Sequence, residues 1–210
     1  MIGILGGTFD PVHYGHLRPA HEVYERLSLD ELHLIPAAMP PHRTPPIATP
    51  GERLRMVTLG VAEFPGLIAD DREIRRGGVS YTVPTLESLR DEIGDEPLYF
   101  IVGSDAFAGL PTWHRWRMLF ELAHVIVVRR PNVSARALPE WASSRLATDV
   151  EATRRRPAGG LVFLDVAPQH VSATELRAAV ARGDTPPPNA LPAPVWEYIR
   201  TQGIYRSRAS

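Results

Sequence analysis

Residues 2–16 read IGILGGTFDPVHYGH, and this stretch decides the fold. Ile2–Leu5 is a short apolar run that Gly6 and Gly7 end, which is typical of a buried strand that meets a tight loop. Two glycines let the backbone turn sharply and approach a ligand closely. Apolar side chains then recur at helical spacing over residues 16–29. The sequence therefore predicts a strand, a glycine turn and a helix as the opening of the fold.

Apolar runs alternate with helical patterns along the rest of the chain. Further strands are predicted at residues 31–35, 67–74, 98–102, 124–128 and 161–166. Further helices are predicted at residues 52–64, 82–93, 113–122, 173–181 and 194–202. Strands that alternate with helices predict parallel βαβ units, and strands that are apolar throughout are covered on both faces. We therefore expect an α/β fold of the Rossmann-like type, with an open parallel sheet and helices on both faces.

The composition excludes several kinds of chemistry. The 210 residues carry 23 basic and 24 acidic side chains, a net charge of −1, and no cysteine, which excludes a disulfide scaffold, a thiolate zinc site and a cysteine nucleophile. Every basic residue is arginine, so a lysine P-loop and Schiff-base chemistry are excluded as well.

The charge balance argues against nucleic acid as a partner, and no apolar run reaches the ~18 residues of a membrane helix. The first residues resemble no secretory signal. We expect one domain over residues 1–210, with a small helical part from about 172–206, in the cytoplasm.

Two histidines at the predicted helix start suggest a phosphate site. His13 and His16 are three residues apart, and side chains at that spacing face the same side of a helix. Amides at a helix N-terminus add donors and positive partial charge for an anion. Two imidazoles aimed at one place there suit charge that develops on a bridging oxygen. The alternative is a glycine turn with two surface histidines. Four further histidines belong to no recognisable motif, and we expect them to be structural: His21, His33, His124 and His170.

Two strings of the sequence resemble a known family. GGTFDPVHYGHL resembles the HxGH signature of the Rossmann-like nucleotidyltransferase superfamily, and within it the bacterial nicotinate-mononucleotide adenylyltransferase family. Residues 171–177, VSATELR, resemble the S-x-T-x-x-R motif of the same proteins, although Ala173 stands where other members have a second serine. Ser172 also suits a helix N-cap with Glu175 as its capping-box partner, so a plain helix start is the alternative.

The resemblance implies an ATP site and names its residues. The expected catalytic residues are His13, His16 and Arg177. The family also carries a PPH-[K/R] segment near the triphosphate and a GxD segment that lines the nucleotide cleft; an exposed loop with a chance His-Arg pair is the alternative for the first of these. The expected ATP-binding residues are Gly6, Gly7, Thr8, Phe9, His13, Gly15, His16, His42, Arg43, Gly103, Asp105, Ser172, Thr174 and Arg177.

The resemblance also implies a pocket for a pyridine nucleotide. In the family an indole stacks on the pyridine ring, and a threonine hydroxyl and backbone amides receive the ring carboxylate. Trp113 and Thr82 match these roles, although Trp113 as a plain core residue is the alternative. His114 stands where many members have an aromatic residue. The expected substrate-binding residues are Tyr81, Thr82, Thr85, Trp113, His114 and Arg130.

Adenylyl transfer from ATP to nicotinate mononucleotide is the function that the resemblance implies. The products are nicotinate adenine dinucleotide and pyrophosphate, in a step of NAD biosynthesis. Mg²⁺ is expected with ATP, held mainly by phosphates and water, so no metal ligands from the chain are expected. ATP and nicotinate mononucleotide are the expected partners, and a homo-oligomer stays open. The alternatives are transfer to nicotinamide mononucleotide or phosphopantetheine, a non-catalytic nucleotide sensor, and a metallohydrolase built on His13, His16 and His21.

Overall fold

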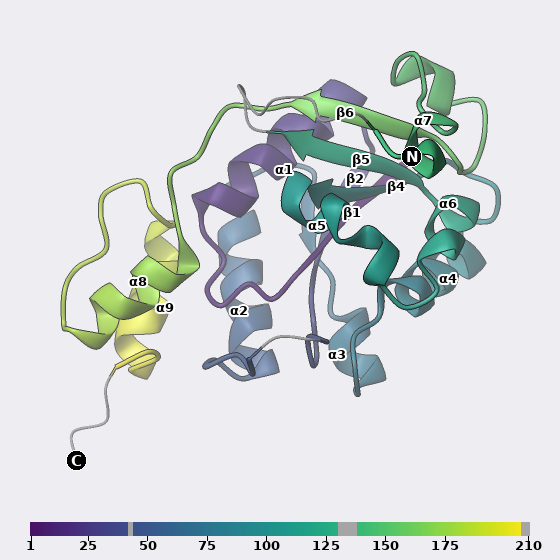
Figure 1. Ribbon diagram of the computed structural model, residues 1–210. Coiled ribbons are helices and arrows are strands. Elements are labelled where there is room, and N and C mark those ends of the chain that lie inside the picture. Colours follow the sequence, from purple (N-terminus) through teal and green to yellow (C-terminus); the bar gives the residue numbers. More distant parts are fainter. Residues whose placement is uncertain (42–43, 130–137, 207–210) are drawn as a thin grey trace. The chain divides into compact units, whose positions relative to one another are not determined.

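The computed structural model describes residues 1–41, 44–129 and 138–206, and within them six strands form one sheet in the order β3-β2-β1-β4-β5-β6 (Figure 1). The strands are β1 (Ile2–Gly7), β2 (Glu31–Pro36), β3 (Leu67–Ala69), β4 (Leu98–Gly103), β5 (His124–Arg129) and β6 (Leu161–Asp165). The α-helices are α1 (Tyr14–Leu27), α2 (Pro50–Val61), α3 (Arg72–Arg76), α4 (Thr82–Ile93), α5 (Ser104–Ala108), α6 (Leu119–Leu122), α7 (Glu140–Ser143), α8 (Ala173–Ala181) and α9 (Ala193–Gln202). Three short 3-10 turns are η1 (Leu110–Thr112), η2 (Trp116–Met118) and η3 (Glu151–Thr153). The predicted α/β fold with an open parallel sheet is confirmed.

The chain forms two compact units, each assembled from separate segments. Unit 1 consists of Met1–Gly6, Glu22–His33 and Tyr81–Pro168, and unit 2 consists of Gly7–His21, Leu34–Ser80 and Gln169–Ser210. The expectation of one domain with a small helical part stays a prediction. None of the helices in the described ranges is long and apolar enough to cross a membrane.

Unit 1 holds the strands whose parallel register is clearest. Phe100 in β4 lies opposite Ile4 in β1 and Val125 in β5, and Val125 lies opposite Leu161 in β6. Figure 1 shows β4, β5 and β6 side by side. Every residue over Leu98–Val102 is buried. Because successive side chains of a strand point to opposite faces, both faces of β4 are covered, as the apolar run predicted.

A buried histidine at the start of β5 is fully bonded to unit 1. The Nδ1 atom of His124 accepts a hydrogen bond from the Gly160 amide at 2.9 Å, and its Nε2 atom lies 2.8 Å from the Arg156 carbonyl. The neutral ring with its proton on Nε2 satisfies both partners. Burial lowers the pKa of His124, which favours that neutral form. This histidine is therefore structural, as expected from its lack of a motif.

Unit 2 contains α2, which begins directly after Thr49. Thr49 is the N-cap of α2: its hydroxyl accepts from the Glu52 amide, and the Glu52 carboxylate accepts from the Thr49 amide at 2.7 Å. Pro50 occupies the first helical position, where proline is well tolerated. This capping box fixes where the loop ends and the helix begins. In the same unit, α2 packs against α9 and β3.

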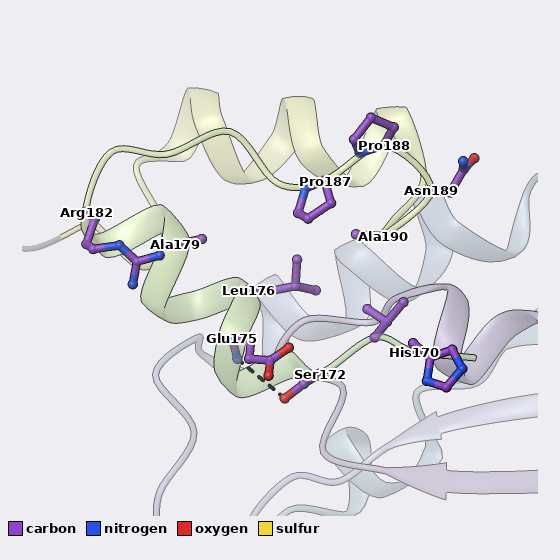
Figure 2. Close-up of a pocket in the computed structure, with 11 residues that line it drawn as sticks. His170, Ser172, Glu175, Leu176, Ala179, Arg182, Pro187, Pro188, Asn189 and Ala190 are labelled. Carbon is purple, nitrogen blue, oxygen red and sulfur yellow. Dashed lines mark hydrogen bonds between the residues drawn. The ribbon is translucent and has the colours of Figure 1, made fainter. Parts of the chain in front are cut away.

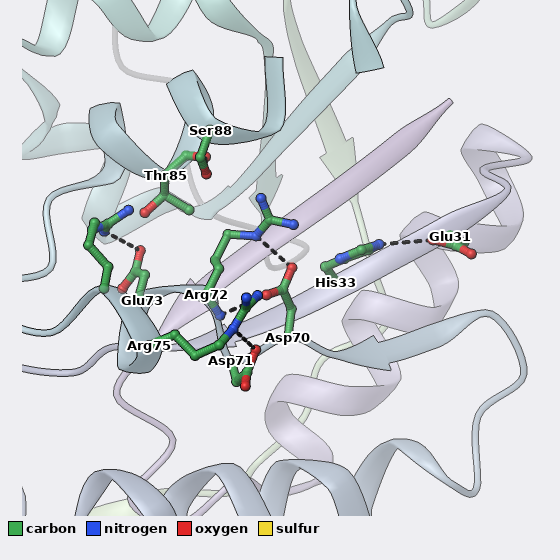
Figure 3. Close-up of polar contacts among 10 residues, drawn as sticks. Glu31, His33, Asp70, Asp71, Arg72, Glu73, Arg75, Thr85 and Ser88 are labelled. Atoms are coloured by element: carbon green, nitrogen blue, oxygen red, sulfur yellow. Dashed lines mark hydrogen bonds and ion pairs between the residues drawn. The ribbon is translucent and has the colours of Figure 1, made fainter. Parts of the chain in front are cut away.

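Two predicted elements were wrong. The strand predicted over residues 67–74 ends at Ala69, because the Asp70 carboxylate accepts from the Arg72 amide at 2.9 Å and from the Arg72 guanidinium at 2.7 Å (Figure 3). A side chain that bonds the backbone two residues ahead forms a turn, and α3 follows it. The helix predicted over residues 113–122 is interrupted at Arg115, whose φ of 52° is left-handed, and the chain forms η2 and α6 instead. The remaining predicted elements are present with ends that shift by a few residues.

Candidate functional site

The turn between β1 and α1 is flanked by two glycines, Gly7 at the end of β1 and Gly15 in the first turn of α1. We call residues Thr8–His16 the histidine turn, and it belongs to unit 2. A Cβ atom on Gly7 would lie 2.8 Å from the Phe9 ring, and one on Gly15 would lie 2.8 Å from the His13 ring. Real Cβ atoms essentially never approach another heavy atom so closely. Both positions therefore favour glycine because aromatic rings occupy the space beside them.

The two imidazoles of the histidine turn lie against each other. The rings of His13 and His16 are stacked with 3.8 Å between their centroids and 26° between their planes. The Phe9 ring meets His16 edge-on at 5.1 Å, and His13 is only 5% exposed. The His13 carbonyl accepts hydrogen bonds from the amides of His16 and Leu17, which begins α1. The structure thus brings together the two histidines that the three-residue spacing places on one side.

Burial keeps these two imidazoles uncharged. It lowers the pKa of His13 to about 4, and it lowers the pKa of His16 well below its ordinary value, with the charge of His13 as a second cause. The Nδ1 atoms of both rings are buried and have no hydrogen-bond partner among the described residues. An unpaired buried polar atom costs free energy. A ligand oxygen that approached these rings would supply a missing partner.

The second motif meets the histidine turn within unit 2. The Ser172 hydroxyl caps α8 by accepting from the Glu175 amide at 3.4 Å. Arg177, one turn further along α8, donates from Nη1 to the Asp10 carbonyl at 2.7 Å, and from Nη2 to the Thr174 hydroxyl at 3.3 Å. The first of these bonds joins residues 167 positions apart in the sequence. The two strings that carry the family resemblance are therefore joined by a direct hydrogen bond.

Sequence reasoning missed a buried arginine that holds the same turn. Arg53 is 0% exposed, and its guanidinium donates to the carbonyls of Thr8 at 2.9 Å, Ala38 at 3.1 Å and Ala48 at 3.3 Å. A buried charge is tolerated only when it is bonded in this way. The sequence did carry a signal: Arg53 precedes the buried Met56 by three residues, on the apolar face of α2.

Sequence reasoning also missed how thoroughly Asp10 is bonded. Asp10 is 6% exposed. Its carboxylate accepts from the Ile47 amide at 2.9 Å, the Ala48 amide at 3.1 Å and the Tyr205 hydroxyl at 2.7 Å. No local pattern reveals the last of these bonds, because Tyr205 lies 195 positions away. The Asp10 carboxylate is thus fixed by two other segments of unit 2, the loop before α2 and the segment after α9.

A pocket of about 280 Å³ lies on one side of α8 (Figure 2). Ser172 of the second motif lines one side of this pocket. Ala190, in the loop that lines the other side, accepts a hydrogen bond through its carbonyl from the amide of Tyr14 at the start of α1. Ser172 is the one expected site residue in its lining. The lining residues are His170, Val171, Ser172, Glu175, Leu176, Ala179, Arg182, Pro187, Pro188, Asn189 and Ala190.

Unit 1 holds the residues expected to contact a nucleoside. Gly103 ends β4 as an exposed residue, and Asp105 is exposed in the first turn of α5. The Ser104 hydroxyl between them donates to the Val128 carbonyl at 3.2 Å, which ties this turn to β5. Gly6, from the expected ATP set, is also in unit 1 and is exposed near the end of β1.

The residues expected at a pyridine ring also lie in unit 1. The rings of Tyr81 and His114 are 4.6 Å apart, which brings the start of α4 to the segment after η1. Trp113 is half-buried, with its ring 6.1 Å from that of Phe100. Thr82 is half-buried at the first position of α4. Thr85 differs from these, because it is 1% exposed and its hydroxyl donates to the Tyr81 carbonyl at 3.4 Å.

Three expected site residues, His42, Arg43 and Arg130, lie outside the described residues. Within residues 1–41, 44–129 and 138–206, no group of three or more His, Asp or Glu side chains could hold a metal ion. The carboxylate nearest to the two imidazoles in sequence, that of Asp10, is already engaged by three donors.

The match of residues 4–179 to the cytidylyltransferase-like family model shows that this chain belongs to that family. Two curated relatives that share one name are similar to most of this chain. The chain is 48% identical over 209 residues to a protein of Methylococcus capsulatus named probable nicotinate-nucleotide adenylyltransferase, covering 98% of this chain and 99% of the relative. It is 51% identical over 186 residues to a protein of the same name from Halorhodospira halophila, covering 87% and 85%. The family resemblance drawn from the two motifs is confirmed.

A solved structure shows the same fold at much lower identity. It is titled Plasmodium falciparum nicotinic acid mononucleotide adenylyltransferase complexed with NaAD. Its TM-score to this chain is 0.73, with 16% sequence identity, and the match covers 97% of this chain and 96% of that one. The Rossmann-like nucleotidyltransferase type expected from the sequence is therefore confirmed at the level of the fold.

Proposed function

We propose that this chain transfers the adenylyl group of ATP to nicotinate mononucleotide, forming nicotinate adenine dinucleotide and releasing pyrophosphate, as a step of NAD biosynthesis. One observation carries the proposal. The Arg177–Asp10 bond joins the two motifs beside the imidazoles of His13 and His16, whose buried Nδ1 atoms lack a partner among the described residues. Relatives with 48% and 51% identity bear the name of this activity.

The reaction is a direct displacement at phosphorus. An oxygen of the mononucleotide 5′-phosphate attacks the α-phosphorus of ATP in line, and the bridging oxygen leaves with pyrophosphate as the bond to it breaks. The second pKa of a phosphate monoester is about 6, so the nucleophile is already ionised near neutral pH. The enzyme therefore needs no strong base and forms no covalent intermediate. Its residues position the two nucleotides and stabilise the charge that builds up.

His13 and His16 stabilise that charge as hydrogen-bond donors. A neutral imidazole carries one N–H, and each of these rings can direct it at a phosphate oxygen. Because His13 is buried and His16 is half-buried, a hydrogen bond to a charged oxygen is stronger there than in water. A bound phosphate also raises the pKa of a nearby imidazole, since it stabilises the protonated form. The amides of Thr8 and Phe9 and the glycines Gly7 and Gly15 complete this phosphate site.

Ser172, Thr174 and Arg177 grip the β- and γ-phosphates. The hydrogen bonds of Arg177 to Asp10 and Thr174 use two of its five N–H groups, so the planar guanidinium has donors left for a phosphate. Its bond to the Asp10 carbonyl fixes where the guanidinium lies relative to the histidine turn. The half-buried Ser172 hydroxyl lies at the N-terminus of α8, where an anion is favoured.

Mg²⁺ would be held in this site through the ATP phosphates and water, with no ligand cluster from the described residues. The described residues offer no ligand cluster, and the Asp10 carboxylate is occupied by three donors. Cations of this kind are commonly held through substrate phosphates and water. When bound, the ion would neutralise phosphate charge.

The nucleoside parts are assigned to residues of unit 1. Trp113 supplies a flat face for the pyridine ring. The exposed His114 follows it in sequence, and its ring lies 4.6 Å from that of Tyr81, which precedes Thr82. The Asp105 carboxylate and Gly103 serve the ribose hydroxyls. The assignments of Thr85, His42, Arg43 and Arg130, the cytoplasmic location and a homo-oligomer stay predictions.

Pyrophosphate release tests this proposal directly. The purified full chain is mixed with ATP, Mg²⁺ and one acceptor: nicotinate mononucleotide, nicotinamide mononucleotide or phosphopantetheine. We expect the fastest release with nicotinate mononucleotide, and mass spectrometry should find nicotinate adenine dinucleotide in an amount equal to the pyrophosphate. A faster reaction with another acceptor would reassign the substrate. ATP binding with no pyrophosphate from any acceptor would favour a nucleotide sensor.

A further inference from the structure

We propose that Asp10 is a positioning residue for adenylyl transfer and that the Tyr205 hydroxyl completes the set of bonds through which it acts. The inference rests on the proposed function. It assigns a role to a carboxylate that lies before the HxGH residues of the first string, and to a hydroxyl that lies outside both strings. It also explains why segments far apart in the sequence converge on one side chain of the histidine turn.

The Asp10 carboxylate is buried and has a donor from each of three residues. Ile47 and Ala48 donate backbone amides from the loop before α2, at 2.9 and 3.1 Å, and the Tyr205 hydroxyl donates at 2.7 Å from the segment after α9. A buried carboxylate without such donors is strongly unfavourable. Burial, and next the bond to Asp10, raise the pKa of Tyr205, so its hydroxyl keeps its proton and remains a donor.

The backbone beside Asp10 needs to be held in place. Phe9 has a φ of 50°, in the left-handed region that aromatic residues rarely adopt. Such a conformation persists only when the surrounding structure fixes it. Phe9 also contacts His16 with its ring edge, at 5.1 Å between centroids. The bonds to Asp10, the next residue, therefore hold the conformation that seats Phe9 against His16.

The two imidazoles depend on this backbone for their orientation. A catalytic histidine is commonly oriented by a hydrogen bond on its second ring nitrogen. His13 and His16 lack such a bond on Nδ1 among the described residues, so packing and the backbone of the turn orient them. Asp10 lies three positions before His13. A shift of Asp10 therefore moves the rings with the turn.

Asp10 also orients the arginine of the second motif. Its carbonyl accepts from Arg177 Nη1 at 2.7 Å, while its carboxylate binds the two amides and Tyr205. One residue thus carries the bonds that place both the imidazoles and the guanidinium. Because catalysis of this kind depends on positioning, loosening that residue should slow the chemical step more than it weakens binding.

Substitution of Tyr205 by Phe tests the role. Y205F removes one hydroxyl and keeps the ring, and Y198F is the matched control, because Tyr198 in α9 has a hydroxyl with no hydrogen bond to the described residues. We measure kcat and KM for both substrates on the full chain, together with the Cε1–H resonances of its histidines by NMR. For Y205F we expect kcat to fall ~10-fold, since small misplacements of catalytic groups are costly. Both KM values should stay within about twofold, the resonances of His13 and His16 should shift, and Y198F should match the wild type.

The opposite pattern overturns the role. If Y205F lowers the urea midpoint but leaves kcat and the resonances of His13 and His16 unchanged, the bond only stabilises the fold. If the wild-type chain transfers no adenylyl group, the proposed function fails, and the resonances alone decide whether Tyr205 positions the rings. If Y205F does not fold, D10N replaces it: it keeps the size of the side chain but forces one donor to face an amide N–H. D10N should lower kcat further, and unchanged kcat and resonances in D10N would again overturn the role.

Discussion

Two regions of this molecule bury neutral imidazoles, and they use them differently. In unit 1, His124 has both ring nitrogens bonded to the backbone, at 2.9 and 2.8 Å. In unit 2, His13 and His16 stack on each other, and their Nδ1 atoms have no partner within the described ranges. Burial lowers the pKa of all three. A lowered pKa therefore does not distinguish the two regions; the unfilled hydrogen-bonding capacity does, and the proposed phosphate site rests on it.

The largest effect on activity is expected at His16. H16A should lower kcat by ~10²–10³-fold, the usual cost of losing a preorganised donor to the transition state. The chain should remain folded, because the lost nitrogen held no bond within the described protein. Pyrophosphate release under saturating substrates measures the effect, and H170A, at an exposed position, is the control. Near-normal turnover in H16A would remove this imidazole from the mechanism.

His124 should show the reverse behaviour. H124A leaves the Gly160 amide and the Arg156 carbonyl without their partner and opens a cavity, so we expect a loss of about 2–3 kcal/mol in the free energy of unfolding. Turnover per folded molecule should stay within about twofold. Urea denaturation and the pyrophosphate assay measure the two quantities. H124N, which can retain an acceptor near the Nδ1 position, should lose less stability. Activity that fell along with stability would contradict a purely structural role.

A smaller effect is expected from pH, and both regions contribute to it. The unfolded chain protonates its histidines near pH 6.5, whereas the pKa of His13 is about 4 in the folded chain. The unfolded state therefore binds more protons between these values, and stability falls as the pH falls through that window. The lowered pKa of His124 acts in the same direction.

Pyrophosphate should change only one of these two contributions. A bound anion stabilises an imidazolium, so saturating pyrophosphate should raise the pKa of His13 by ~1 unit and leave that of His124 unchanged. NMR titration of the Cε1–H resonances, with and without pyrophosphate, checks both pKa values. A shift at both histidines, or at neither, would contradict the assignment of the anion site to the histidine turn.

The sequence was most informative where a pattern was local. The run at residues 98–102 and the helix at residues 173–181 appear as predicted, because strand and helix periodicity are set by neighbours. The strand expected over residues 67–74 failed since Asp70 uses its carboxylate to cap a turn at Arg72. The helix expected from residue 113 failed at Arg115, whose left-handed φ has no signature in the sequence.

The site was predictable through its motifs and obscure elsewhere. The histidine turn and Arg177 were found from their spacing and family resemblance, and the structure joins them through Asp10. Arg53 was overlooked because a charged residue is rarely fully buried. The Tyr205–Asp10 bond spans 195 positions, and no pattern in a single sequence reports a contact at that distance.

The Tyr205–Asp10 bond can form only late in the synthesis of this stretch of chain, because its two residues are 195 positions apart. At about 5–20 residues per second, the ribosome needs roughly 10–40 seconds to travel from Asp10 to Tyr205. A nascent chain that stops between residues 177 and 205 already contains His13, His16 and Arg177. It lacks the Tyr205 hydroxyl that completes the bonding of Asp10. The last of these bonds can therefore form only after residue 205 has been added to the chain.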